Sequence, residues 1–216
     1  MMSAGSQPIE NSTLTNQVSS DQYLIRSNEA ELVIAAQKGS VEAFNQLVQS
    51  YQDRIYSLCV RILGDYDLAD DIAQNTFVTA YLNLPRFRNG SFRSWLYRIA
   101  TNACYDEFRR HKRYPVLSLE DQEASEENLS PLYDFSARTL LPETELERHE
   151  LELTVQQALN QLDVQHRAVV LLVDQQDLDY QQAADVLGIP IGTLKSRLAR
   201  ARQRLHDLLN QAGIAG

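Results

Sequence analysis

Apolar residues recur at three- and four-residue steps along most of this chain, which is the spacing of one buried face on an α-helix. The pattern predicts a first helix from Glu29 that ends near Gly39. Ser40 is a suitable N-cap for a second, longer helix, and Gly64 is placed to end it. The two-residue alternation of a β-strand is not seen here, so the pattern predicts an all-helical fold.

Two further helices are predicted in the stretch 67–113, and Pro85 separates them. Beside its apolar face, the earlier helix has a second stripe about a quarter-turn away, with Asp67, Asp71, Gln74 and Val78. The later helix buries an apolar face that includes Phe92, Trp95, Leu96 and Ile99. Its opposite face is predicted to be exposed and carries Ser94, Tyr97, Arg98, Thr101, Asn102, Tyr105 and Arg109. Arginines mixed with aromatic rings and an amide suit phosphates and unstacked bases.

Helical periodicity returns at Leu151, and a further helix follows Asp163. Beyond it, Ala184, Gly188 and Leu194 have the spacing of a helix-turn-helix, in which a small residue, a left-handed turn and a core leucine let two helices cross closely. The second of these helices is basic. A basic helix is often only a solvated surface, but in this position it is expected to enter the major groove of DNA.

At 216 residues the chain has room for one large or two small domains. Its formal net charge of −9 would argue against nucleic-acid binding. However, nine acidic and only two basic residues lie within 114–148, whereas basic residues cluster at 86–98, 109–113 and 195–204. Because the local field decides where phosphate binds, the net charge does not exclude a nucleic-acid partner.

Composition divides the chain into four segments. Residues 1–28 are rich in Ser, Asn and Gln and predict a disordered tail. Residues 114–148 are acidic, contain three prolines and predict a flexible linker. The predicted fold is therefore all-α, with two small helical domains, 29–113 and 149–216, joined by that linker.

No catalytic constellation is visible, since the chain shows no paired acid and base, no nucleophile with a partner and no phosphate-binding glycine loop. Cys59 and Cys104 stand alone, Cys59 in an apolar helix where a buried thiol is expected, and the histidines lack metal-site spacing. We therefore expect no enzyme activity, metal, cofactor or small-molecule substrate. Without a membrane span or signal peptide, we expect no membrane insertion and a cytoplasmic location.

Three stretches carry a resemblance to a known family. The string from DxxQxTFxxxY through SFRSWLYRIATN to RRHKR closely resembles the second conserved region of bacterial sigma factors of the sigma-70 family, most of all the extracytoplasmic-function (ECF) group. LVIAAQKGSVEAFNQLVQSYQDRIY resembles the start of the same domain, and IPIGTLKSRLARARQRL resembles the fourth conserved region. The resemblance implies a promoter-melting domain over 29–113 and a promoter-reading helix-turn-helix domain over 149–216.

The resemblance also implies a function and partners. Such a protein binds core RNA polymerase, directs it to the upstream (minus-thirty-five) and downstream (minus-ten) elements of promoter DNA, and helps to open the duplex. Many members of the family bind an anti-sigma factor, so the resemblance also allows such a partner for this protein. In the family the linker runs toward the active centre and RNA exit path of the polymerase. The resemblance alone implies this role for 114–148, because no motif in that segment indicates it.

Residue roles carry over by position. The polymerase-clamp helix of the family matches at Asp71, Gln74 and Phe77. Phe77 is apolar and is expected to pack, so the expected polymerase contacts are Asp71 and Gln74, together with Asp67 of the same stripe. Downstream-element recognition and melting match at Phe87, Ser91, Trp95, Ile99 and Asn102, although Trp95 and Ile99 also fit a purely structural core. Arg98 and Arg109 share the helix face of Asn102 and are expected to hold the strand backbone, and Arg88 is assigned to the same site. Upstream-element contacts match at Lys195, Ser196, Arg197 and Arg200. The loop between Phe87 and Phe92 looks one residue shorter than the family's F-R-G-[DE]-x-x-F pattern, which leaves open which base it accepts.

Two other classes of function agree less well with the sequence. A DNA-binding response regulator can end in a similar helix-turn-helix, but it would carry a receiver domain with strands alternating with helices and a phosphorylatable Asp. The helical period of 29–113 disfavours that alternative. A nucleotide hydrolase is disfavoured further, because it needs a catalytic set.

Overall fold

The computed structural model describes residues 29–88, 90–113 and 143–214, and every regular element in that part of the chain is helical. Residues 29–37 form a first helix. The elements that follow are α2 (Val41–Leu63), α3 (Tyr66–Asn83), the 3₁₀ turn η1 (Leu84–Arg86), α4 (Phe92–Arg113), α5 (Glu143–Asn160), α6 (Val164–Val170), the π-helical turn η2 (Leu171–Gln175), α7 (Tyr180–Leu187) and α8 (Ile191–Gln211). The predicted all-α class is confirmed, and no strand of a receiver domain occurs in the described residues.

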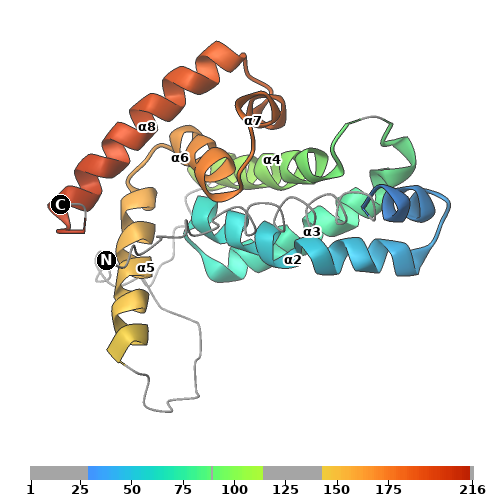
Figure 1. The fold of residues 1–216 in the computed structure, drawn as a ribbon, viewed down its shortest axis with the longest axis horizontal. Helices are drawn as coiled ribbons and strands as arrows, with labels where there is room; N and C mark the ends of the chain where they lie inside the picture. The colour runs from blue at the N-terminus through green and yellow to red at the C-terminus, as the bar shows by residue number, and fades with distance from the viewer. Residues whose placement is uncertain (1–28, 89, 114–142, 215–216) are drawn as a thin grey trace, which may run out of the picture.

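The first helix and α2 to α4 form one bundle (Figure 1). The Ser40 hydroxyl accepts the Ala43 N–H at 3.2 Å and so begins α2, as the sequence predicts. Gly64 ends α2 in the left-handed conformation at φ +75°. A Cβ at this position would also come within 2.8 Å of the Asn160 side-chain amide, which would then have to shift. Pro85 follows the end of α3 and lies within η1.

Small residues set the spacing of this bundle. Ala69, Ala73 and Ala80 of α3 are buried, and α3 contacts both α2 and α4. The larger buried side chains belong to α2 and α4 and include Leu47, Ile55, Leu58, Ile62, Leu96 and Tyr97. Val41, in the first turn of α2, is exposed although it fits the helical spacing of the apolar residues that follow it. Cys59 is buried as expected, and a hydrogen bond with its thiol, together with burial, raises the pKa of Cys104.

The helix-turn-helix is present as predicted. Ala184 and Leu194 are buried, and Gly188 takes a left-handed turn at φ +64° between α7 and α8. Asp179 begins α7 through a capping box with Gln182, in which each side chain accepts the other residue's backbone N–H. Asp163 caps α6, in agreement with the predicted start of that helix.

The predicted tail and most of the predicted linker lie outside the described residues. α5 begins at Glu143, inside the stretch assigned to the linker. The two domain ranges themselves stay a prediction, because the described elements pack together across the predicted boundary.

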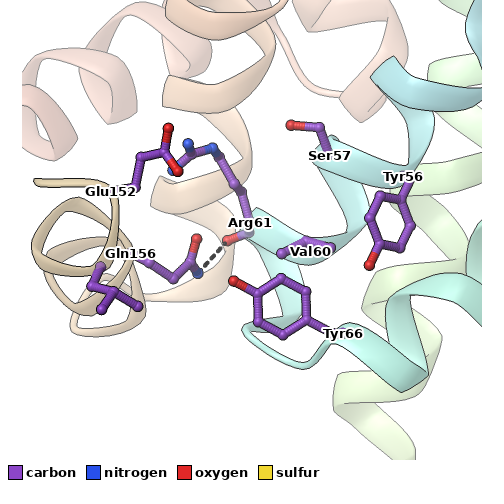
Figure 2. A pocket seen from close by; sticks show the side chains of 8 residues that line it. Tyr56, Ser57, Val60, Arg61, Tyr66, Glu152 and Gln156 are labelled. Atoms are coloured by element: carbon purple, nitrogen blue, oxygen red, sulfur yellow. Dashed lines mark hydrogen bonds between the residues drawn. The ribbon is translucent and has the colours of Figure 1, made fainter. Parts of the chain in front are cut away.

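The C-terminal half packs directly against the N-terminal bundle, a contact that the sequence did not predict. Around the end of α2, the Arg167 guanidinium donates to the Ile62 carbonyl at 2.5 Å. We call this contact between the two halves the seam. Figure 2 shows a hollow in the seam between α2 and α5, where the Gln156 amide donates to the Arg61 carbonyl at 3.5 Å. These carbonyls belong to the last turn of α2, where no helical N–H is available to them. Side chains of α5 and α6 therefore cap α2 across the seam.

A second part of the seam covers α4. The Tyr97 hydroxyl donates to the Gln176 side-chain oxygen at 2.6 Å, and both residues are buried. The Arg93 guanidinium donates to the Gln176 carbonyl, and the Gln175 amide donates to the Ser57 hydroxyl at 3.0 Å. The π turn η2 thus ends against α4, with Gln176 as its principal contact.

This packing corrects the predicted exposed face of α4. Tyr97 and Thr101 are fully buried, and Ser94 and Tyr105 are partly covered. The prediction was wrong because hydroxyl-bearing side chains fit a solvated face and a packed one equally well. Arg98, Asn102 and Arg109 of the same predicted face are exposed.

Candidate nucleic-acid interface

An aromatic cluster stands where η1 leads into α4. Phe87 is half-buried, and its ring centroid lies 5.0 Å from that of Trp95 with the planes tilted by 39°. Phe92 lies beneath both rings, at 6.2 Å from Phe87 and 5.7 Å from Trp95, and it is buried against Tyr51. The cluster fixes one side of the Phe87–Trp95 pair in the core while the other side meets solvent. Partly exposed rings of this kind can stack on a base.

Ser91 has a structural role that the sequence reading did not assign. Its hydroxyl accepts the Ser94 N–H at 3.2 Å, and its carbonyl accepts the Trp95 N–H at 3.0 Å. Ser91 is therefore the N-cap of α4, and a Ser just before an amphipathic run is the signal that could have shown it. Arg88, in the same loop, is exposed.

Further along α4, the exposed residues follow the aromatic pair in one line. Trp95, Arg98, Ile99 and Asn102 are spaced by three and four residues, so they lie on the same side of the helix. Asn102 is about 10 Å beyond Trp95 along the helix axis. Trp95 and Ile99 are half-buried, which agrees with neither a fully exposed role nor a purely core one. The line is too long for one base and suits an extended strand.

Arg109 lies two turns beyond Asn102 and is already engaged. Its guanidinium forms an ion pair with Asp106 at 2.5 Å, with both side chains largely exposed. An exposed pair of this kind is worth about 0–1 kcal/mol, so a phosphate can replace the carboxylate at small cost.

The acidic stripe of α3 is exposed as predicted. Asp67, Asp71 and Gln74 all face solvent, and the Gln74 amide donates to Asp70 at 2.8 Å. Gln74 and Asp70 also line a groove between α2 and α3, together with Val48, Gln52, Asp53, Tyr56, Ala73 and Phe77. The apolar end of this surface holds Val78, which the sequence placed in the stripe and which is 57% exposed, and Leu82, which the sequence analysis did not include and which is 69% exposed. Large exposed apolar side chains beside charges mark a protein-binding surface.

The basic surface of α8 is largely free. Lys195, Ser196 and Arg200 are exposed, and the Lys195 ammonium lies 5.9 Å from the centre of the Tyr180 ring at the start of α7. The Ser196 hydroxyl donates to the Thr193 carbonyl at 2.9 Å. Arg202, on the same helix, is instead held by Asp174 of η2 through two hydrogen bonds of 2.5 and 3.0 Å. That pairing raises the pKa of Arg202.

Arg197 of α8 acts electrostatically on α4. It is half-buried, and its positive charge acts on the Tyr105 hydroxyl of α4. Burial raises the pKa of Tyr105, and the Arg197 guanidinium opposes that shift. In this arrangement a residue predicted for the upstream element therefore faces the helix predicted for the downstream element.

Within the described residues, no group of three or more His, Cys, Asp or Glu side chains gathers where it could hold a metal ion. None of the described helices is long and apolar enough to cross a bilayer.

Comparison with known proteins decides the family. Residues 47–114 match the family described as Sigma-70 region 2, and residues 152–205 match Sigma-70, region 4. The chain is 39% identical to the ECF RNA polymerase sigma factor SigW of Bacillus subtilis, over 80% of this chain and 91% of that protein. The chain belongs to the ECF group of sigma factors. The RNA polymerase sigma-H factor of Pseudomonas aeruginosa is 36% identical over 86% of this chain and 96% of its own length.

Solved structures of two similar proteins share the fold. CnrH, solved in complex with the cytosolic domain of CnrY, is 25% identical, with a TM-score of 0.61 over 85% of this chain and 98% of its own. The sigma factor RpoE of Bartonella quintana, solved with the anti-sigma factor NepR, is 25% identical, with a TM-score of 0.58 over 79% of this chain and 98% of its own. As an ECF sigma factor, this protein binds core RNA polymerase and recognises promoters for transcription initiation. Sigma factors are non-enzymatic initiation factors.

Proposed function

We propose that this sigma factor captures unpaired promoter bases along α4, docks on core polymerase through α3 and reads the upstream element with α8. The observation that carries the proposal is the line from the Phe87–Trp95 ring pair to exposed Asn102. Rings supply stacking, an amide supplies both a donor and an acceptor, and Arg88, Arg98 and Arg109 supply charge for the phosphates. Catalysis is left to the polymerase, and the protein works in the cytoplasm.

An anti-sigma factor is a further proposed partner. The similar sigma factors CnrH and RpoE were solved with CnrY and NepR, and the second of these is named as an anti-sigma factor. The exposed apolar end of α3, with Val78 and Leu82, offers such a partner the same surface as it offers polymerase. Competition between the two partners would then regulate initiation.

The decisive experiment for the whole proposal is transcription in vitro with core polymerase on a genomic promoter library. Addition of this protein should produce transcripts from a defined subset of promoters. Equal transcript profiles with and without the protein would refute the proposal.

Substitution Asp71→Arg should sharply weaken binding to core polymerase. Asp71 is exposed on α3, so the change leaves the fold intact but reverses the charge offered to a basic surface. Breaking one partner of a desolvated interface pair costs about 2–5 kcal/mol. Pull-down of core enzyme measures the loss, with Glu31→Arg, an exposed charge reversal on the first helix, as the control. Undiminished binding by a folded Asp71→Arg protein would remove Asp71 from the interface.

On α8, Lys195→Ala and Arg200→Ala should each weaken binding to the upstream element. Loss of a base contact costs about 1–3 kcal/mol and relaxes the preference at one promoter position, whereas loss of a phosphate contact weakens all sequences alike. Binding to a set of point-substituted promoters, measured at several salt concentrations, separates the two. Arg202→Ala is the control, because Asp174 already holds that guanidinium. Unchanged affinity in both variants would make this surface a solvated one only.

A further inference from the structure

The first helix reaches across the bundle to the turn that carries Phe87. Its last residue, Gln37, donates from the side-chain amide to the Leu84 carbonyl at 3.1 Å and to the Phe87 carbonyl at 2.6 Å. An amide group has two N–H hydrogens, so both are used on this one turn. Figure 1 shows the first helix (blue) beside the segment that joins α3 to α4.

The turn needs such support because its own restraints are few. A 3₁₀ turn has poorer hydrogen-bond geometry than an α-helix, and Pro85 has no N–H to donate. Buried Leu84 anchors one end, and the Phe87 N–H closes the turn on the Leu84 carbonyl at 3.0 Å. On the far side, Gly90 has a φ of +113°. Gln37 therefore holds the backbone at the point where the Phe87 ring leaves it.

We propose that Gln37 is a positioning residue for downstream-element recognition, which fixes the Phe87 loop so that the ring stands beside Trp95 where an unpaired base can stack. The inference deepens the proposed function of the Phe87–Asn102 surface and rests on it. It concerns a residue outside the matched range 47–114 of sigma region 2. Gln37 is half-buried and its amide donates to backbone carbonyls of the turn, so it acts through the position of Phe87.

The competing explanation is that Gln37 merely stabilises the bundle. In that case its loss lowers the melting temperature and leaves the response to different bases unchanged. A positioning role predicts the reverse, because a displaced Phe87 ring stacks poorly on the base while the α2–α4 core remains packed. The two explanations therefore differ in a measurable quantity.

Trp95 is the only tryptophan in the chain, so its fluorescence reports directly on the ring next to Phe87. The full-length protein is titrated with three single-stranded oligonucleotides of about ten nucleotides, which contain only adenine, only cytosine or only thymine. Quenching of Trp95 gives an affinity for each base. The variants are Gln37→Met, which keeps the length but has no donor, and Gln37→Glu, which keeps the shape. Gln49→Met, an exposed position on α2, is the matched control.

Wild type and Gln49→Met should be quenched with a clear preference among the three bases. Stacking of one base corresponds to about a five- to 150-fold change in affinity. Both Gln37 variants should therefore bind the preferred oligonucleotide at least about fivefold more weakly, and their affinities for the three oligonucleotides should differ less than those of the wild type. The added charge of Gln37→Glu repels all strands alike and does not itself alter preference.

Unchanged affinities and preference in Gln37→Met would overturn the inference while leaving the proposed function intact. A lowered melting temperature with an unchanged preference would do the same and make Gln37 purely structural. If no oligonucleotide quenches Trp95 in the wild type, the base-binding role of the Phe87–Asn102 surface fails, and the inference fails with it.

Discussion

Arg167→Met is expected to lower the free energy of unfolding by about 3 kcal/mol and to loosen the packing of the two halves. Arg167 is 5% exposed and donates four hydrogen bonds. They run to the Ile62 carbonyl, the Asn160 carbonyl, the Asn160 side chain and the Leu162 carbonyl, at 2.5, 2.8, 3.1 and 3.2 Å. Its guanidinium also lies 5.8 Å from the centre of the Phe108 ring of α4.

No carboxylate forms a hydrogen bond with this buried cation, and helix geometry explains why it is tolerated in the described structure. Ile62 lies in the last turn of α2, and Asn160 is the last residue of α5. Both helix ends present free carbonyls and the negative end of a helix dipole. Burial lowers the pKa of Arg167, and nearby Asp163 opposes that shift. The methionine variant keeps the bulk but leaves these carbonyls without a donor.

Urea unfolding followed by circular dichroism measures the stability loss, and small-angle scattering measures any opening of the seam. Arg204→Met removes an exposed arginine from α8 and should change stability by no more than about 0.5 kcal/mol. An Arg167→Met protein with wild-type stability and an unchanged radius of gyration would show that Arg167 does not hold the halves together.

The seam illustrates what the sequence could and could not predict. Caps and turns at Ser40, Gly64 and Gly188 were predicted because their conformations depend on a few neighbouring residues. The seam joins residues far apart in the chain, such as Tyr97 with Gln176 and Ile62 with Arg167. Periodicity tells which face of a helix is buried but does not identify what covers it.

The burial of Arg167 had a signal in the sequence, whereas the role of Gln37 had none. Arg167 stands three and four residues before Val170 and Leu171, so helical spacing places it on a buried face. Its charge made a surface position the natural expectation. Gln37 offers no comparable signal, since its partners are backbone carbonyls of a turn that lies 47 and 50 residues away. Backbone acceptors are present at every residue and leave no trace in the sequence.

Burial of one face of α4 decides which residues of the proposed Phe87–Asn102 surface DNA can reach. Tyr97 is buried against Gln176 of the C-terminal half and Thr101 is also buried, whereas Phe87 is partly exposed and Arg98 and Asn102 are exposed. The positive charge of Arg197 in the helix-turn-helix also acts on Tyr105 of α4. In this conformation a single DNA strand could therefore reach Phe87, Arg98 and Asn102 but not Tyr97 or Thr101.

Asn102→Ala is expected to bind core polymerase and duplex promoter normally and yet to form open complexes at least about tenfold less well. Asn102 is exposed, so the substitution should change stability by less than about 0.5 kcal/mol. Extruding a base costs a few kcal/mol, which stacking and hydrogen bonds to the base edge must recover. Losing about 1.4 kcal/mol of that recovery is a tenfold change.

Phe87→Ala should have the same phenotype, because a ring that stacks on a base contributes about 1–3 kcal/mol. Permanganate footprinting of unpaired thymines measures opening, and Asn45→Ala, an exposed amide on α2, is the control. A promoter with a pre-melted bubble should rescue Asn102→Ala only in part, since melting is then supplied but base recognition is still missing. Full rescue would assign Asn102 to strand separation alone. Opening at wild-type rates by both variants would place the melting surface elsewhere on the protein.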